Sequence, residues 1–196
     1  VPMPPAFLPG APLGPQYSPR ELDRYDGGLM AQGPSSELMN ERFDLSRAAL
    51  DAFSARSHER AHAATRAGKF RDQMVPITAD PDDPTGPVID SDEGIREHID
   101  PAKMASLKAV FGADGRTTAA NSSQISDGAA ALLIADREYA ERNGLIPRAR
   151  FRALSVAAAD PIIQFTAILD AAHKALGRSG LAVEEIDLFE VNEAFA

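Results

Sequence analysis

The chain contains no cysteine and no tryptophan among its 196 residues, and only 6% of them are aromatic. The absence of cysteine excludes disulfides, thiolate-rich metal sites and a cysteine nucleophile within these residues. No stretch approaches the roughly 20 apolar residues that a membrane-spanning helix needs, and no basic-then-apolar start indicates a signal peptide. We therefore expect a cytoplasmic protein without a membrane partner.

Positive charge is also scarce. The chain has 20 Lys and Arg residues against 29 Asp and Glu, which gives a formal net charge of −9. A nucleic-acid-binding surface needs clustered Lys and Arg, and here the basic residues are scattered. The charge balance argues against a nucleic-acid partner, whereas a few local arginines can still bind a small phosphate-bearing ligand.

Proline is concentrated at the start of the chain, where 7 of the 15 prolines fall in the first 20 residues. Because proline lacks an N–H group and fixes φ, this start is incompatible with a helix or a central strand. The first residue is Val1 rather than an initiator methionine. We expect the start to be a linker, or a loop that belongs to a larger fold.

Four later segments carry helix signals, namely a capping side chain or a proline at the start, or a glycine at the end. The first predicted helix is residues 47–67, after the cap Ser46 and before Gly68, and the second is a short helix from Pro101 after the cap Asp100. The third is residues 137–143, after the cap Asp136 and before Gly144. The fourth is residues 165–176, whose apolar side chains repeat at helical spacing up to Gly177 and Gly180.

Three apolar runs in the second half predict strands. They are Gly128 to Ala135 ("GAAALLIA"), Phe151 to Ala158, and Ile186 to Val191. The first is continuously apolar, which is typical of a strand that is buried on both faces. Buried strands that alternate with helices predict an α/β fold with a parallel layer covered by helices.

The sequence "HERAH", His58 to His62, matches the zinc-peptidase pattern H-E-x-x-H. On a helix, His58 and His62 share one face, so both rings could reach one metal while Glu59 activates water. A third protein ligand is also needed, and the next histidine, His98, lies beyond an acidic loop. An exposed helix without metal is the expectation, and a zinc hydrolase is the alternative.

Two further segments carry the most specific pattern. "TTAANSSQISDGAAALLIAD", Thr117 to Asp136, leads small and hydroxyl side chains into an apolar run, and "DLFEVNEAFA" ends the chain. Together with "ELMNERFDLSRAALDAFSARSHERA", "AGKFRDQMVPI" and "DEGIREHIDPAKMASLKAVF", in this order and spacing, they resemble the thiolase family. Thiolases form or cleave 3-ketoacyl-CoA by acyl transfer through a cysteine thioester.

The resemblance implies a thiolase-like β-α-β-α-β layered fold that is incomplete in this chain. A thiolase has two similar halves, with a loop region inserted into the first. The implied division is residues 1–116 for the loop region, residues 117–135 for the last strand of the first half, residues 136–150 for a connecting helix and linker, and residues 151–196 for the start of the second half.

The resemblance also assigns site residues. In the family, the Asn of "NEAF", here Asn192, holds a water that hydrogen-bonds the thioester oxygen, and one such donor is worth about 3 kcal/mol. Arg96 matches the arginine at the adenine and phosphate end of CoA, where a planar cation suits stacking and anion pairing. The other positions that border the CoA groove are Phe111, Ala119, Ser123, Ala194 and Phe195. Glu193 is expected to support the surrounding loops.

The implied activity is that of a CoA-dependent acyltransferase with CoA as substrate, no permanently bound cofactor and no metal. Family order puts the nucleophilic Cys upstream of Val1, and the His of a "GHP" motif and a second Cys downstream of Ala196, so the segment alone is expected to be inactive. Family members are homodimers or homotetramers, which is carried over by analogy. A non-catalytic CoA-binding module of thiolase type is the second alternative.

Overall fold

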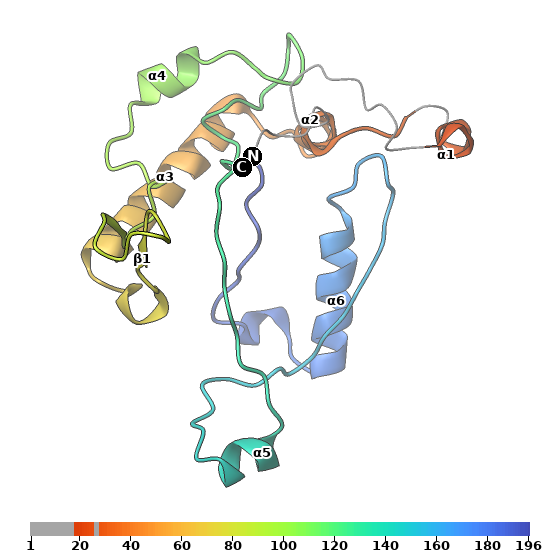
Figure 1. Cartoon of the computed structure of the whole chain (residues 1–196). Coiled ribbons are helices and arrows are strands. Elements are labelled where there is room, and N and C mark those ends of the chain that lie inside the picture. Colours follow the sequence, from red (N-terminus) through yellow and green to blue (C-terminus); the bar gives the residue numbers. More distant parts are fainter. Residues whose placement is uncertain (1–17, 26–27) are drawn as a thin grey trace. The chain divides into compact units, whose positions relative to one another are not determined.

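The computed structural model describes residues 18–25 and 28–196, and the chain divides into two compact units. The first unit contains Ser36–Gln124 and Glu193–Ala196. The second contains Ile125–Asn192 and the described residues that precede Ser36. Figure 1 labels the main helices and strand β1. Within these described ranges, no helix is long and apolar enough to cross a membrane.

The predicted linker at the start of the chain falls largely on residues 1–17, which lie outside the described residues. Just after them, helix α1 spans Pro19–Arg24. Pro19 lies in the first turn of α1, where backbone N–H groups have no intrahelical partner, so the N–H group that proline lacks is not needed there. The expectation that no helix begins before residue 20 is therefore wrong. Ser18 and Glu21 form a capping box at this helix start.

The first unit is mainly helical, and its predicted helices are confirmed. Helix α3 begins after the cap Ser46, whose hydroxyl accepts the Ala49 N–H group, and Gly68 follows its end at a φ of 69°. The elements of this part of the chain are α2 (Gln32–Arg42, with its first residues in the second unit), α3 (Arg47–Arg66), η3 (Arg71–Gln73), the antiparallel strands β1 (Ile77–Thr78) and β2 (Val88–Ile89), and α4 (Pro101–Ser106).

The buried interior of the first unit is mostly polar. Among the described residues of this unit, the buried apolar side chains are Leu50 and Met104, whereas the buried polar residues are Ser36, Asn40, Thr117, Thr118 and Asn121. Burial of a polar group is costly unless it is hydrogen-bonded. Every buried side-chain nitrogen and oxygen of the described residues has such a partner. The unit is therefore held together by matched hydrogen bonds more than by apolar packing.

Glu37 is the charged member of this interior. Its carboxylate accepts the Arg116 and Thr117 backbone N–H groups, with N to O distances of 2.7 to 3.0 Å, and an Asn40 Nδ2 donor at 3.0 Å. Burial on its own raises the pKa of Glu37, but these hydrogen bonds together outweigh burial and leave the pKa below its usual value of 4.5. The ionised carboxylate thus ties helix α2 to residues 116 and 117.

The second unit contains three further helical elements. Asp136 caps α5, since its carboxylate accepts the Tyr139 N–H group at 2.7 Å, and Gly180 ends α6 at a φ of 70°. Both features confirm the predicted helices, although Gly177 lies inside α6 and does not end it. The elements are α5 (Arg137–Arg142), α6 (Ala167–Ser179) and η4 (Val183–Glu185).

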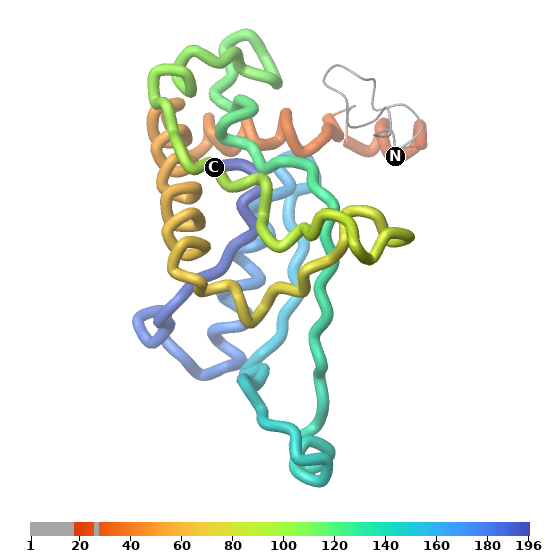
Figure 2. Tube along the Cα trace, turned by 60° about the vertical axis from the view of Figure 1, so that its left-hand side comes forward, coloured from red at the N-terminus to blue at the C-terminus, as the bar shows by residue number. Residues whose placement is uncertain are grey.

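The three predicted strands of the second half do not form. Residues 128–135, 151–158 and 186–191 have no strand pairing, and Leu133 and Leu188 are 77% and 88% exposed. Figure 2 traces the first of these segments as a long extended run before α5. Each strand of a sheet needs a neighbour to pair its backbone groups, and the described residues supply none here. The predicted buried parallel layer is therefore absent from this structure.

One extended segment nevertheless has a helix beside it. Residues 152–156 run along α6, where Ser155 Oγ donates to the Ala171 carbonyl at 2.7 Å and Lys174 Nζ donates to the Val156 carbonyl at 3.4 Å. Such an extended segment with a covering helix is the local form of an α/β layer. Residues 152–156 therefore have their covering helix, but no neighbouring strand among the described residues.

The turn between this segment and α6 contains a strained residue. Gln164 has a φ of 57°, in the left-handed region that non-glycine residues rarely adopt. Its side-chain amide donates to the Met30 carbonyl at 2.6 Å and to Ser35 Oγ at 3.1 Å, and Ser35 Oγ donates to the Ile162 carbonyl at 2.7 Å. These hydrogen bonds hold the turn in its unfavourable conformation.

Candidate functional site

The first unit contains a cavity of about 640 Å³. Four parts of the unit form its walls: helix α3, the loop of residues 92–100, helix α4, and the segments 119–124 and 193–196. A volume of this size is within the range of small-molecule sites. The residues that line it include Ser57, His58, Gly94, Arg96, Lys103, Ala119, Ser123, Gln124 and Glu193.

Helix α3 forms one wall because its cavity-lining side chains lie one turn apart. Phe53, Ser57 and Ala61 follow each other at four-residue spacing, and Ser54 and His58 do the same. Residues at this spacing share one face of a helix. The face is therefore small and polar at its centre, with an imidazole at one edge, which suits a ligand better than it suits an apolar core.

The two motif segments that carry the family resemblance form the opposite wall together. The Ser123 N–H group donates to the Ala194 carbonyl at 2.9 Å, and the Ala196 N–H group donates to the Asn121 carbonyl at 3.0 Å. Ser122 and Phe195 form an isolated antiparallel bridge between them. Residues 119–124 and 193–196 are thus neighbours, although about 70 residues separate them in the sequence.

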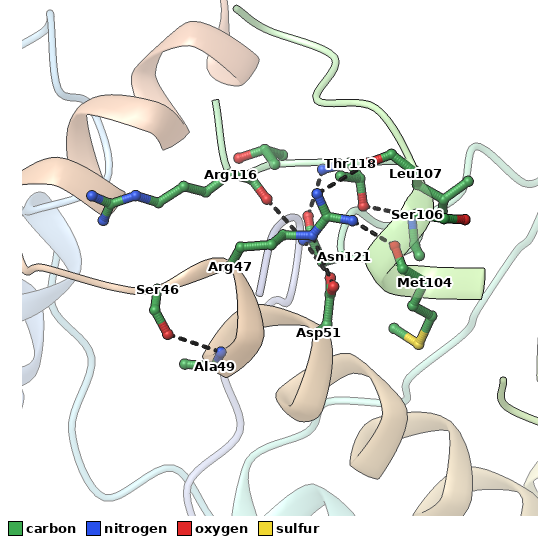
Figure 3. A network of polar contacts seen from close by, with 12 residues as sticks. Ser46, Arg47, Ala49, Asp51, Met104, Ser106, Leu107, Arg116, Thr118 and Asn121 are labelled. Carbon is green, nitrogen blue, oxygen red and sulfur yellow. Dashed lines mark hydrogen bonds and ion pairs between the residues drawn. The ribbon is translucent and has the colours of Figure 1, made fainter. Parts of the chain in front are cut away.

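A buried polar network ties this wall to α3, as Figure 3 shows. The Asn121 side chain accepts the Thr118 N–H group at 2.7 Å and donates to the Arg116 carbonyl and to Asp51 Oδ1, at 3.0 and 2.9 Å. The other Asp51 oxygen accepts Arg47 Nε at 2.8 Å. Asn121 is only 2% exposed, so water cannot replace these partners.

The same Arg47 guanidinium continues the network to α4, since it donates to the Met104 and Leu107 carbonyls at 2.5 and 3.2 Å. Both carbonyls lie at the end of α4, where the Met104 carbonyl also accepts the Leu107 N–H group at 3.1 Å. Sequence reasoning missed Arg47, Asp51 and Asn121, because a single polar side chain in a sequence does not reveal how many of its bonds are buried.

Six of the sequence-predicted residues lie in this unit. Three of them, Arg96, Ala119 and Ser123, line the cavity. Phe111 and Phe195 pack edge to face, with ring centroids 6.1 Å apart and an interplanar angle of 85°. Ala194 contributes its carbonyl oxygen to the bond with Ser123.

Asn192 belongs to the second unit and is exposed. The expectation that it ends a buried strand is wrong for this structure, because residues 186–191 are unpaired and largely exposed. A strand has to be covered before it can present a side chain in a dry site. The exposed position of Asn192 in this structure therefore gives no support to a catalytic role.

The histidine pair of α3 faces the loop of residues 92–100. His58 Nδ1 accepts the Arg96 backbone N–H group at 3.2 Å, and His62 Nε2 lies 3.8 Å from Glu97 Oε1. Glu59, between the histidines, is exposed. In the part of the chain that the structure describes, no three His, Asp or Glu side chains cluster in a way that could hold a metal ion.

The cavity lining carries three carboxylates, Asp92, Asp100 and Glu193, and two cations, Arg96 and Lys103. Its carboxylates are occupied: Asp92 accepts the Gly94 N–H group at 2.8 Å, Asp100 caps α4, and Glu193 accepts the Ser57 hydroxyl at 2.8 Å. The last bond agrees with the expected supporting role of Glu193. Arg96 and Lys103 have no carboxylate within ion-pair distance among the described residues. Two cations are therefore available to a phosphate-bearing ligand.

Gln124 crosses from one wall toward the loop of residues 92–100. A Cβ atom placed on Gly94 would lie only 1.5 Å from Gln124 Nε2 and 2.3 Å from Gln124 Cδ. The amide of Gln124 therefore rests directly on the Gly94 backbone, a position that any side chain at residue 94 would fill. A larger residue at position 94 would therefore require the flexible Gln124 side chain to move.

Comparison with known protein families covers nearly the whole described chain. Residues 22–138 match the family model of the thiolase N-terminal domain, and residues 145–196 match the thiolase C-terminal domain. A 3-ketoacyl-CoA thiolase of Vibrio cholerae is 42% identical over 170 residues, which are 86% of this chain and 43% of that protein. A steroid 3-ketoacyl-CoA thiolase of Mycobacterium tuberculosis is 43% identical over 175 residues, 89% of this chain and 41% of that protein.

Solved structures give the same result. A dimeric peroxisomal thiolase of Saccharomyces cerevisiae matches with a TM-score of 0.85 and 34% identity, over 94% of this chain and 47% of the yeast chain. An acetyl-CoA acetyltransferase of Bacillus anthracis matches with a TM-score of 0.80 and 37% identity, over 85% of this chain and 42% of the other. The chain spans less than half the length of these relatives, and its path confirms the thiolase-like α/β fold class. This chain belongs to the thiolase family.

Proposed function

We propose that this chain is part of a CoA-dependent acyltransferase that forms or cleaves 3-ketoacyl-CoA through a cysteine acyl-enzyme. The observation that carries the proposal is the cavity of the first unit. Arg96, Ala119 and Ser123 line it together, and its two cations, Arg96 and Lys103, have no carboxylate partner among the described residues. These are the residues that the family resemblance assigns to CoA. The relatives named above are described as 3-ketoacyl-CoA thiolases and as an acetyl-CoA acetyltransferase.

In this proposal CoA is a substrate and no cofactor is bound permanently. Arg96 pairs with the phosphate and adenine end of CoA, Ser123 contacts the pantetheine arm, and Ala119 borders the groove. Phe111, Ala194 and Phe195 border the same groove. The wall made by residues 119–124 and 193–196 supports this arrangement, because it joins the pantetheine residues to the segment that follows Asn192.

The proposed chemistry needs a thiolate that accepts the acyl group and a base that removes the α-proton. The 196 residues contain no cysteine, so the thiolate is assigned to polypeptide outside them. Asn192 is assigned the task of orienting a water that stabilises the developing oxyanion. Preorganised donors of this kind contribute about 3 kcal/mol, or roughly a hundredfold in kcat.

The wider assignments are proposals of the same kind. The yeast relative is described as dimeric and peroxisomal, which supports a homo-oligomer and leaves the expected cytoplasmic location a prediction. The predicted division of the chain, with residues 151–196 as the start of the second thiolase half, is also retained as a proposal.

The test is a 3-ketoacyl-CoA cleavage assay with CoA on the complete product of the gene that encodes this chain. We expect Asn192→Ala to lower kcat about a hundredfold and Arg96→Ala to raise KM for CoA with little change in kcat. Asn143→Ala is the matched control, because Asn143 is exposed at the end of α5.

The outcomes separate the alternatives. Binding of CoA without any cleavage indicates the non-catalytic CoA-binding module. Unchanged kcat in Asn192→Ala contradicts the assigned role of the asparagine. The 196-residue chain alone is expected to cleave nothing, and turnover by it overturns the assignment of the nucleophile to other polypeptide.

A further inference from the structure

The proposed function leaves the "HERAH" motif of α3 without a role. Its two histidines are partly buried and lie one helical turn apart, and both face the loop that carries Arg96. His58 contacts residue 96 and His62 lies near residue 97, whereas the intervening Glu59 is exposed. In a zinc peptidase the glutamate faces the metal together with the histidines. Because Glu59 is exposed here, the arrangement differs from a zinc site and indicates a contact between α3 and the loop of residues 92–100.

His58 makes the specific contact. Its Nδ1 atom accepts the backbone N–H group of Arg96 at 3.2 Å. A ring nitrogen accepts a hydrogen bond only when it carries no proton, so the bond requires neutral imidazole with its proton on Nε2. The bond goes to the backbone and not to the guanidinium, so it fixes where the loop lies without occupying the charged end of Arg96.

The same loop has two other contacts. Asp92 accepts the Gly94 N–H group within the loop, and the amide of Gln124 lies close to Gly94. The loop is thus bonded to α3 on one side and contacted by Gln124 on the other, and both sides line the cavity. A charged side chain on such a fixed loop needs less ordering when a ligand binds than one on a free loop.

We propose that His58, with His62 in support, is a positioning residue for Arg96, and that the histidine pair of α3 holds the ligand-binding loop in place. This inference rests on the proposed function in taking Arg96 as a residue that binds the phosphate-bearing end of CoA. It predicts that His58 acts on the affinity for CoA and not on the chemical step, because its contact is with the loop and not with the reacting groups.

The experiment uses three substitutions at one position in the complete gene product. The Asn side chain places its Oδ1 atom about where His Nδ1 lies, whereas the Gln side chain reaches instead to the position of Nε2. We expect His58→Ala and His58→Gln to raise the Kd for CoA about fivefold, the effect of losing one hydrogen bond, and His58→Asn to keep the wild-type Kd. Turnover at saturating CoA stays unchanged in all three variants.

The control variant is His173→Ala, since His173 is exposed on α6 in the second unit. Hydrogen exchange of the Arg96 amide in the CoA-free protein is measured alongside Kd. Exchange should be faster in His58→Ala and His58→Gln, and unchanged in His58→Asn. A merely structural role would make all three variants fail together, and that result overturns the proposal.

Two further results overturn it. If the Arg96 amide exchanges at the wild-type rate in His58→Ala, the loop is not held by His58. If stoichiometric zinc is bound by the wild-type protein and lost in His58→Ala, the pair is a metal site. The Arg96→Ala variant separates the role of Arg96 in binding from the anchoring of its loop. If the Kd for CoA is unchanged in that variant while exchange is faster in His58→Ala, the role of Arg96 is refuted and the anchoring of its loop by His58 is not.

Discussion

The two units of the chain differ in which side chains they bury and which they expose. The first unit encloses hydrogen-bonded polar groups, with Asn121 and Thr118 almost completely shielded from water. The second leaves long apolar side chains exposed along its extended segments, for example Leu133, Val156 and Leu188. In a typical globular domain the apolar side chains would be the buried ones.

The difference lies in what each unit supplies to its own segments. Matched hydrogen bonds need their partners at fixed positions, and the partners of Asn121 and Asp51 come from the described residues of the first unit. An extended apolar segment needs a neighbouring strand, and the second unit contains no paired strand among its described residues. The candidate ligand cavity lies in the unit that provides its own partners.

The largest expected effect comes from removing the centre of the polar network. Asn121→Ala leaves the Thr118 N–H group, the Arg116 carbonyl and Asp51 Oδ1 without their Asn121 partner, and should destabilise the first unit by about 3 kcal/mol. Hydrogen exchange of the Thr118, Ser123 and Ala196 amides measures the loss. Amides of α6 should keep their exchange rates, and Asn143→Ala serves as the exposed control. An equal effect on both units would contradict the independence of the first.

A smaller effect is expected from the strained turn of the second unit. Gln164→Ala removes two hydrogen bonds and keeps the unfavourable φ, which should destabilise the turn by about 2 kcal/mol. Gln164→Gly removes the same bonds but relieves a strain of about 1 kcal/mol. Limited proteolysis between residues 158 and 166 should therefore rank alanine as more susceptible than glycine. Equal cleavage of the two variants would show that the turn stores no strain.

The smallest effect concerns pH and the first unit alone. Because hydrogen bonds depress the pKa of folded Glu37, its contribution to stability is present above the unfolded value of 4.5 and is lost as the pH falls through the lower folded value. Glu37→Gln should reduce this loss, as measured by exchange of the Thr117 amide from neutral to acidic pH. The control is Glu41→Gln, at an exposed position of the same helix. Identical acid profiles of wild type and Glu37→Gln would exclude the carboxylate as the cause.

Local signals predicted the helices well. Ser46, Asp100 and Asp136 cap the helices that the sequence assigns to them, and Gly180 ends α6. Caps act over three or four residues, so their effect can be read from the sequence alone. Local signals did not locate helix α2, because it lacks a clear apolar face.

Non-local features were beyond such reasoning. The three predicted strands have the composition of buried strands, but pairing depends on a neighbour that composition does not specify. The site was predicted through the family motifs, which pointed to Arg96, Ala119 and Ser123. No local sequence pattern predicts the roles of Asp51 and Asn121 or the contact of His58 with residue 96, because they depend on which segments meet in space.

The bond between Ser123 and Ala194 closes a loop of about 70 residues, and this has a consequence for how the cavity wall assembles. Closing such a loop costs about 4 kcal/mol of chain entropy, yet doubling its length would add only about 0.6 kcal/mol. During synthesis the wall cannot form until the residues after Asn192 have emerged. Insertions between residues 124 and 193 should thus be tolerated far better than changes in the two wall segments, residues 119–124 and 193–196.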